Sequence, residues 1–364
     1  MGESHRHSLT DMDLVAMEQL AASLGQPAFR GRQLFGWVHS SLETDLFRMS
    51  SLPRAFLSQL LDRHPVATAE LVQELVSVDG STRKWLLRLG DGQRVEAVLM
   101  EAPGAGQEEG RHTVCVSSQV GCALGCAFCA TGQVGFARQL SPGEIVEQVY
   151  HFERMLREGR SATEGTAPKR MVDNVVFMGM GEPLANYQAV VAAIRLLTSP
   201  LGLGLGARRI TVSTAGLVPA IERLAAEGLQ LGLAISLHAA TDTLRSRLMP
   251  INRRYPLARV LDAAARYSAV TGRRVTYEYA LIEGVNDEEA QARQLSRLLA
   301  GQLCHVNLIP LNRSLDPSLK PSSPARAAAF QRVLESARIP CSLRRTKGQD
   351  ILAACGQLRY TTGR

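Results

Sequence analysis

Apolar positions recur at helical spacing in the first part of the chain. Between residue 9 and about residue 65 they fall every three or four positions, which is typical of amphipathic helices. Three helices are expected, over residues 11–24, 29–40 and 54–61. Gly25 and Pro27 are typical of the end of the first helix. We therefore predict a small helical domain over residues 1–68.

A strand-like region follows. Residues 69–78, 84–89 and 94–100 have the pattern of β-strands, and the Asp-Gly pairs between them indicate tight turns. Residues 102–110 contain Gly, Pro and Glu and predict a loop. We expect residues 69–110 to form a β extension with a linker.

The chain then alternates between strand-like and helix-like runs. We expect six strand–helix pairs, at residues 112–120 with a helix from Ser141, 174–178 with 185–197, 209–213 with 218–228, 231–237 with 257–270, 274–281 with 287–299, and 305–310 with 324–338. A last strand-like piece covers residues 341–345. Ser141 and Glu144 form a capping box at the start of the first of these helices. Repeated β/α units predict a parallel sheet with helices outside it, over residues 111–345. The pattern alone leaves an open doubly wound sheet and a partial barrel equally possible.

Composition places the chain among ordinary globular proteins, with 364 residues, 45% hydrophobic and 21% charged. No apolar run is long enough to span a bilayer, and the N-terminus lacks the apolar core of a signal peptide. We therefore expect a cytoplasmic protein without a membrane partner. The net charge of +7 permits a polyanionic partner but does not by itself indicate one.

The residues that follow the strands are small or polar, unlike the strands themselves. These strand ends are residues 121–129, 179–183, 213–216, 236–238, 283–287 and 310–312. Because the carboxyl ends of parallel strands meet at one edge of the sheet, they predict a single site on one face.

Three of the seven cysteines lie in the first of these strand ends, at Cys122, Cys126 and Cys129. Clustered cysteines without a disulfide-rich composition indicate metal or redox chemistry. Three thiolates can bind an iron–sulfur cubane and leave one of its four irons open. A structural zinc site prefers four ligands, and the nearest histidines, His112 and His151, are distant in sequence. A chance grouping of buried cysteines is the remaining explanation.

The loop Cys-x3-Cys-x-Phe-Cys, with Phe128 as its aromatic residue, matches the radical S-adenosylmethionine (SAM) signature. Further stretches resemble the RlmN/Cfr family of radical SAM methyltransferases that modify adenine in RNA, and its RlmN branch in particular. They are residues 115–122, 178–184, 208–214, 234–238, 307–312 and 354–358. The resemblance extends from about Phe29 to about Leu358.

The resemblance implies an α/β fold, a partial (β/α)6 radical SAM barrel with a helical N-terminal domain. Cys122, Cys126 and Cys129 would bind one 4Fe-4S cluster, whose open iron would chelate the amino and carboxylate groups of SAM. The implied SAM site consists of Gly181, Glu182, Ser213, Ser236, Leu237, His238 and Asn312. Without its position at a strand end, His238 alone would be interpreted as a structural histidine.

The resemblance also implies a mechanism that consumes two SAM molecules. The first methylates Cys355, in a C-terminal segment over residues 346–364. The second yields a 5′-deoxyadenosyl radical that takes hydrogen from the S-methyl group, and the resulting methylene radical adds to adenine. Cys115 then attacks the sulfur of Cys355, forming a transient disulfide and releasing the product. Glu96 matches the family's proton acceptor, although a solvated charge on a strand is an equally good interpretation.

The implied substrates are adenine 2503 of 23S rRNA and adenine 37 of tRNA, methylated at C2. We also expect a monomer and an electron donor such as flavodoxin or ferredoxin. Methylation at C8, a radical enzyme with a non-RNA substrate and a zinc-stabilised RNA-binding protein are the alternatives. Basic residues that could contact RNA phosphates are Arg30, Arg32, Arg83, Lys84, Arg88, Arg94, Arg208, Arg209, Arg344, Arg345 and Lys347. Cys304 and Cys341 are expected to be small core residues.

Overall fold

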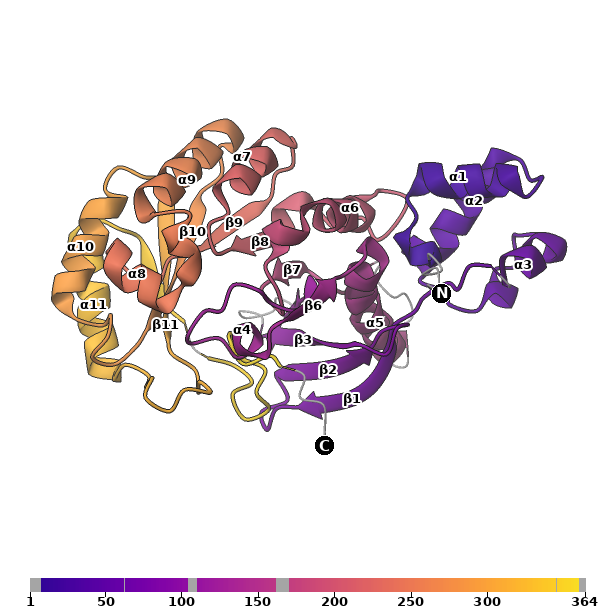
Figure 1. Ribbon diagram of the computed structural model, residues 1–364. Coiled ribbons are helices and arrows are strands. Elements are labelled where there is room, and N and C mark those ends of the chain that lie inside the picture. The colour runs from indigo at the N-terminus through magenta and orange to yellow at the C-terminus, as the bar shows by residue number, and fades with distance from the viewer. Residues whose placement is uncertain (1–7, 62, 104–109, 162–169, 345, 360–364) are drawn as a thin grey trace.

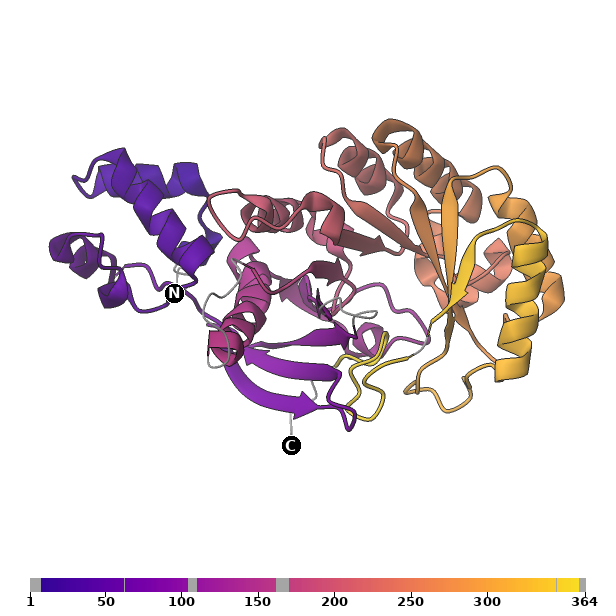
Figure 2. The same cartoon turned by 180° about the vertical axis from the view of Figure 1, so that it is seen from behind.

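The computed structural model describes residues 8–61, 63–103, 110–161, 170–344 and 346–359. The N-terminal helices lie at one end of the molecule and the later β/α units at the other (Figures 1 and 2). A continuous sheet and the long helix α5 (Pro142–Ser161) lie between them. The chain is therefore elongated, with its strands in the middle.

The N-terminal region contains α1 (Leu14–Ser23), α2 (Ala28–Gly36) and α3 (Arg54–Leu61), as predicted. Short helical turns lie between them, at η1 (Leu9–Asp11), η2 (Trp37–Ser41) and η3 (Leu46–Arg48). Helix α1 begins three residues later than expected because the carboxylate of Asp13 caps it, accepting a hydrogen bond from Ala16 N at 2.8 Å.

Among the described residues, ten strands form one sheet in the order β1-β2-β3-β4-β7-β8-β9-β10-β11-β12. Strands β1 (Glu70–Val76), β2 (Thr82–Arg88) and β3 (Arg94–Ala102) are antiparallel, and β3 pairs antiparallel with β4 (Arg111–Cys115). From β4 onward the neighbours are parallel. These strands are β7 (Asn174–Phe177), β8 (Ile210–Thr214), β9 (Gly232–Ser236), β10 (Val275–Leu281), β11 (Cys304–Pro310) and β12 (Cys341–Leu343).

The expectation of one strand over residues 112–120 is wrong. Strand β4 ends at Cys115, and β5 (Gln119–Gly121) pairs instead with β6 (Phe136–Gln139) in a separate two-stranded sheet. Ser117 explains the break, because its backbone N–H donates to the Gln148 side chain at 2.7 Å and its hydroxyl donates to the Glu96 carbonyl at 2.6 Å. The Ser117 carbonyl also accepts a bond from Gln148 Nε2 at 3.0 Å, so both backbone groups of this residue bond to one side chain of α5 and not to a neighbouring strand.

The predicted helices follow the parallel strands and lie along the outer side of the sheet (Figure 1). They are α5, α6 (Tyr187–Thr198), α7 (Val218–Ala226), α9 (Leu257–Thr271), α10 (Glu289–Leu299) and α11 (Pro324–Ser336). The capping box at the start of α5 is confirmed, since Ser141 and Glu144 exchange hydrogen bonds of 2.9 and 3.1 Å. Two short helices were not predicted, α4 (Ala130–Val134) and α8 (Asp242–Leu248). No helix in the described ranges is long and apolar enough to cross a membrane.

Buried polar contacts connect the N-terminal helices to α5. Thr10 Oγ1 donates to the Glu147 carboxylate at 2.5 Å, and His39 Nδ1 lies 2.8 Å from the Tyr150 hydroxyl. Burial lowers the pKa of His39 to about 4. The junction therefore holds this imidazole in its neutral form.

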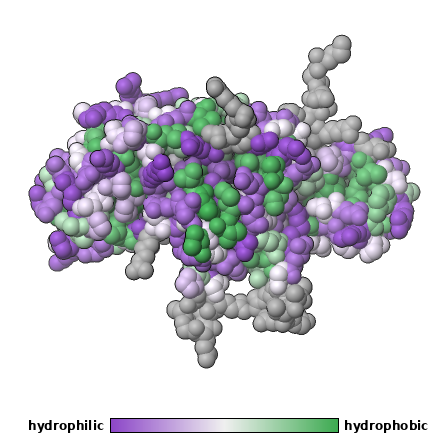
Figure 3. All heavy atoms as spheres, turned by 90° about the horizontal axis from the view of Figure 1, so that it is seen from below, coloured by the Kyte–Doolittle hydropathy of each residue, from purple (hydrophilic) through white to green (hydrophobic). Residues whose placement is uncertain are grey.

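Strand β1 forms one edge of the sheet and is the lowest strand in Figure 1. Leu71, Val72 and Val76 of this strand are exposed. The face seen from below has a hydrophobic area near its middle, surrounded by polar side chains (Figure 3). The sheet is therefore not closed on this side by described residues.

Candidate active site

The cysteine loop begins at a position that only glycine can occupy. Gly121 has φ +76°, and a Cβ placed on it would lie 1.9 Å from the Gly135 carbonyl oxygen. That oxygen accepts a hydrogen bond from Cys122 N at 2.7 Å. The chain can therefore cross closely over the end of α4 and enter the loop.

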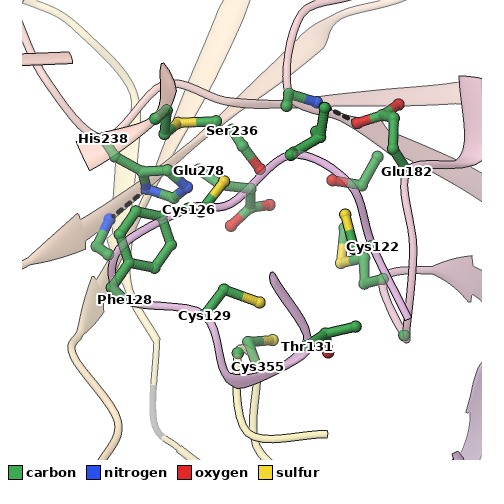
Figure 4. A pocket seen from close by; sticks show the side chains of 18 of the residues that line it. Cys122, Cys126, Phe128, Cys129, Thr131, Glu182, Ser236, His238, Glu278 and Cys355 are labelled. Atoms are coloured by element: carbon green, nitrogen blue, oxygen red, sulfur yellow. Dashed lines mark hydrogen bonds between the residues drawn. The ribbon is translucent and has the colours of Figure 1, made fainter. Parts of the chain in front are cut away.

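Cys122, Cys126 and Cys129 line one cavity at the carboxyl ends of the strands (Figure 4). Its walls include residues that follow or end β7, β8, β9 and β11, among them Glu182, Ser213, Ser236 and Asn312. Five of the six predicted strand ends contribute residues to this cavity, whereas none of residues 283–287 is among the described residues that line it. The space inside it is about 1070 Å³, a volume that includes open solvent at the mouth.

The chemistry of the three thiols fits an iron–sulfur cluster. Burial raises the pKa of Cys122 to about 11, and burial with the neighbouring thiolates raises the pKa of Cys126. Bound iron cations would stabilise the thiolates, which are the form that binds metal, and would thereby offset the cost of ionising these buried thiols. In the described ranges, no three His, Cys, Asp or Glu side chains converge to hold one metal ion. Thiolates on different irons of a cubane need not converge in this way, so this finding is compatible with a cluster.

The cavity brings together all but one of the predicted SAM residues. Those that line it are Gly181, Glu182, Ser213, Ser236, His238 and Asn312. Leu237 is not among the described residues that line it. Its side chain is fully buried in the core, and its backbone N–H donates to the Glu278 carbonyl at 3.0 Å. The alternation of side chains after β9 turns Leu237 away from its two neighbours.

The Glu182 carboxylate is held rigidly at the cavity wall. It accepts hydrogen bonds from Ala215 N at 2.7 Å and from Leu184 N at 3.0 Å (Figure 4). Burial raises its pKa to about 7, and these donors oppose the rise. Gly181, just before it, has φ +104°, and a Cβ there would lie 2.6 Å from Gln119. The glycine allows the chain to turn this carboxylate toward the cavity.

His238 combines a structural contact with a place in the wall. Its Nδ1 accepts a hydrogen bond from Ala280 N at 2.9 Å, so the proton of the neutral ring lies on Nε2. Burial lowers its pKa to about 3. Its backbone has φ +58°, which is uncommon outside glycine, and its ring packs edge-on against Phe128 at 4.8 Å. The histidine therefore links the cysteine loop to the ends of β9 and β10.

Cys355 lines the first cavity and also a second one, in which Cys115 lies. The two cavities share Met178, Ile309, Asn312, Arg344, Cys355 and Leu358. Burial, with a contribution from the Cys355 thiolate, raises the pKa of Cys115 to about 12. The structure thus brings together two cysteines that are 240 residues apart in sequence, both as free thiols.

Glu96 is buried and is not among the described residues that line either cavity. Its carboxylate lies 2.9 Å from Lys84 Nζ and accepts a hydrogen bond from Arg359 N at 2.7 Å. Burial raises its pKa, although Lys84 opposes the rise. The interpretation of Glu96 as a solvated charge is therefore wrong. Its assignment as the proton acceptor stays a prediction.

Three functional candidates were missed or misassigned. Glu278 lines the first cavity, with Oε1 bonded to Asn307 Nδ2 at 3.0 Å and Oε2 without a partner among the described residues. A lone carboxylate within the apolar strand at 275–281 was the available signal.

Arg344 lines both cavities, where the Cys355 thiolate raises its pKa. Arg245 of α8 is fully buried and donates to the carbonyls of Ala215 and Ser236 at 2.7 and 3.0 Å.

The structure contradicts the placement of Lys84 among the phosphate-binding candidates, because this side chain is buried in its pair with Glu96. Three other candidates, Arg32, Arg83 and Arg88, form ion pairs with glutamates. Arg345 lies outside the described residues. Pairing at the surface leaves these side chains able to exchange partners, whereas burial removes Lys84 from contact with RNA.

Known proteins resemble this chain over nearly its whole length. The profile of the Radical SAM superfamily matches residues 116–295, and that of the ribosomal RNA large subunit methyltransferase N-terminal domain matches residues 7–65. A Moorella thermoacetica protein described as a probable dual-specificity RNA methyltransferase RlmN is 49% identical over 346 residues, 95% of each chain. The chain belongs to the RlmN family.

Other RlmN relatives and a solved structure agree with this assignment. A protein of the same description from Frankia casuarinae is 50% identical, covering 98% of this chain and 83% of its own length. The crystal structure of a radical SAM methyltransferase from Sphaerobacter thermophilus is 47% identical with a TM-score of 0.90. The alignment covers 97% of this chain and 99% of that one. The predicted radical SAM fold is therefore confirmed for this RlmN chain.

Proposed function

We propose that this protein methylates C2 of adenine in 23S rRNA and in tRNA, through an S-methyl group on Cys355. The observation that carries the proposal is the position of Cys355, which lies in the wall between two cavities. One cavity holds the three cysteines of the signature loop, and the other holds Cys115. A methyl carrier needs access both to the cavity with the signature cysteines and to the cavity with Cys115.

Different residues of the protein would bind the cluster and SAM. A 4Fe-4S cluster on Cys122, Cys126 and Cys129, when bound, supplies the electron that cleaves SAM. Glu182 is suited to the SAM ammonium group, since its carboxylate already faces the cavity with fixed geometry. Ser213, Ser236 and His238 offer hydrogen-bonding groups for the rest of the cofactor.

The two remaining cysteines carry the methyl group and release the product. The Cys355 thiolate displaces the sulfur of a first SAM and gains the methyl group. After a hydrogen atom is transferred from this group to the 5′-deoxyadenosyl radical of a second SAM, its carbon would add to adenine. The adduct would then lose one proton and return one electron to the oxidised cluster. The Cys115 thiolate then attacks the Cys355 sulfur and forms the S–S bond, the bond between sulfur and the transferred carbon breaks, and that carbon takes up a proton to become the methyl group of the product.

RNA is proposed as the substrate because the relatives are described as dual-specificity RNA methyltransferases and the N-terminal region matches an rRNA methyltransferase domain. A target adenine must leave its stack to reach a cavity of this kind. We further propose a monomeric cytoplasmic enzyme that takes electrons from a flavodoxin or ferredoxin.

The test is incubation of the anaerobically reconstituted protein with SAM, a reductant and 23S rRNA fragments or tRNA, followed by nucleoside analysis. We expect 2-methyladenosine. Formation of 8-methyladenosine would support the C8 alternative, and no methylated adenosine from either RNA would refute the proposal.

Cys355→Ala separates radical formation from methyl transfer. We expect this variant to form 5′-deoxyadenosine from SAM and to transfer no methyl group to RNA, because the carrier sulfur is absent. Cys304→Ala is the matched control, since Cys304 is buried outside the residues that line either cavity. Full methylation by Cys355→Ala would contradict the mechanism.

A further inference from the structure

The segment that carries Cys355 has little structure of its own. Residues 346–359 form turns and bends without a strand or helix. Its position must therefore be set by contacts with the rest of the protein, and two groups of contacts are present.

One group comes from the core. Asn312 Nδ2 donates to the Cys355 carbonyl at 3.0 Å, Ala130 N donates to the Gly356 carbonyl at 2.8 Å, and Thr131 Oγ1 donates to the Leu358 carbonyl at 2.5 Å. The bonds from Ala130 and Thr131 connect the segment to α4, which follows the cysteine loop, and the bond from Asn312 connects it to the residues after β11. They fix the side of Cys355 that faces the first cavity.

The other group comes from the β extension. Lys84 of β2 and Glu96 of β3 lie diagonally across the two strands and form an ion pair of 2.9 Å, with side chains 9% and 7% exposed. Lys84 Nζ also donates to the Leu352 carbonyl at 3.2 Å, and Glu96 Oε2 accepts from Arg359 N at 2.7 Å. Each member of the pair therefore binds one backbone group of the segment.

The two contact points lie on opposite sides of Cys355 in sequence, three residues before it and four after it. A buried ion pair is a poor source of stability by itself, because desolvation offsets the attraction between its charges. This pair uses its remaining hydrogen-bonding capacity on the backbone that flanks Cys355. Both carboxylate oxygens of Glu96 are thereby engaged.

We propose that Lys84 and Glu96 act as positioning residues, which hold Cys355 in the wall shared by the two cavities. The inference rests on the proposed function of Cys355 as the methyl carrier and adds the device that places it. For this positioning role, Glu96 does not need a carboxylate that is free to accept a proton. The role also includes Lys84, which has no function if Glu96 serves only as a proton acceptor.

The test uses the reconstituted holoenzyme and SAM without RNA, and it follows methylation of Cys355 by mass spectrometry of the C-terminal peptide. Lys84→Met removes the charge and the bond to the Leu352 carbonyl while keeping the side-chain length. Glu96→Gln removes the negative charge. We expect both variants to methylate Cys355 at least about tenfold more slowly than wild type, the effect of losing one charged hydrogen bond. Lys84→Arg should recover most of the rate.

Two controls keep the result specific. Glu74→Gln removes the same charge from an ion pair at the surface, between Glu74 of β1 and Arg83 of β2, and should leave the rate unchanged. Iron content and formation of 5′-deoxyadenosine should stay at wild-type levels in Lys84→Met and Glu96→Gln. Their loss would mean that the pair merely supports the fold, and would overturn the proposal.

The outcomes separate the inference from the proposed function. If wild type acquires no methyl group on Cys355, the proposed function fails. If wild type, Lys84→Met and Glu96→Gln all methylate Cys355 at one rate, the positioning proposal fails. If, in addition, Glu96→Gln alone stalls with RNA present, Glu96 is the proton acceptor and not a positioning residue.

Discussion

Replacing Gly121 with alanine tests how the cysteine loop is built. The new Cβ would lie 1.9 Å from the Gly135 carbonyl oxygen, whereas real contacts of this kind stay beyond 3.0 Å, so the two backbones must separate by at least about 1 Å (3.0 minus 1.9). The same oxygen accepts the bond from Cys122 N, which this movement would break. The substitution therefore acts directly at the first cysteine of the loop.

The magnitude can be assembled from three contributions. A positive φ in a residue other than glycine costs about 1–2 kcal/mol. Forcing extra volume between packed groups costs roughly 1–3 kcal/mol, and the broken hydrogen bond about 1 kcal/mol. The free energy of unfolding should thus fall by roughly 3–6 kcal/mol, the range of their sum.

Gly125 provides the matched control within the same loop. It has φ +61°, and a Cβ there would meet no atom within 4 Å. Gly125→Ala therefore keeps the conformational cost of about 1–2 kcal/mol and lacks the steric one. Urea unfolding of the two variants measures the difference, and iron content after anaerobic reconstitution shows whether the loop still binds a cluster. Equal destabilisation by the two substitutions would refute the account of the loop given above.

Two further substitutions test buried groups. Arg245→Met should lower the free energy of unfolding by roughly 3–5 kcal/mol, because several buried carbonyls lose their donor. It should also weaken SAM binding, measured by equilibrium dialysis. Arg247→Met, at an exposed position of the same helix α8, should change neither quantity. His39, whose folded pKa of about 4 lies below its ordinary 6.5, contributes stability that is present above pH 6.5 and is lost as the pH falls toward 4. Between pH 7 and pH 5 wild type should therefore lose about 2 kcal/mol more than His39→Gln in urea unfolding; parallel pH profiles of the two proteins would contradict this.

The fold was largely predictable because its strands and helices alternate with distinct periods. The prediction of one strand over residues 112–120 failed because the backbone of Ser117 bonds to the Gln148 side chain, 31 residues further along the chain, and no local pattern encodes that contact. Antiparallel pairing of β3 with β4, the next strand of the chain, joins the β extension to the parallel strands.

The candidate site was predictable where its chemistry follows strand ends, as for Glu182 and Ser213. Lys84 and Glu96 were misread because alternating charges on a strand ordinarily face water. Their burial comes from a segment more than 250 residues further along the chain. Glu278 and Arg344 likewise become functional candidates only because they line the cavities, which the sequence alone does not show.

The wall shared by the two cavities combines residues of the core with Cys355 and Leu358, which lie near the end of the described residues. During synthesis the loop with Cys122, Cys126 and Cys129 therefore emerges long before Cys355. A chain clipped between this loop and residue 355 would keep the three cysteines and lack Cys355, the residue proposed as the methyl carrier.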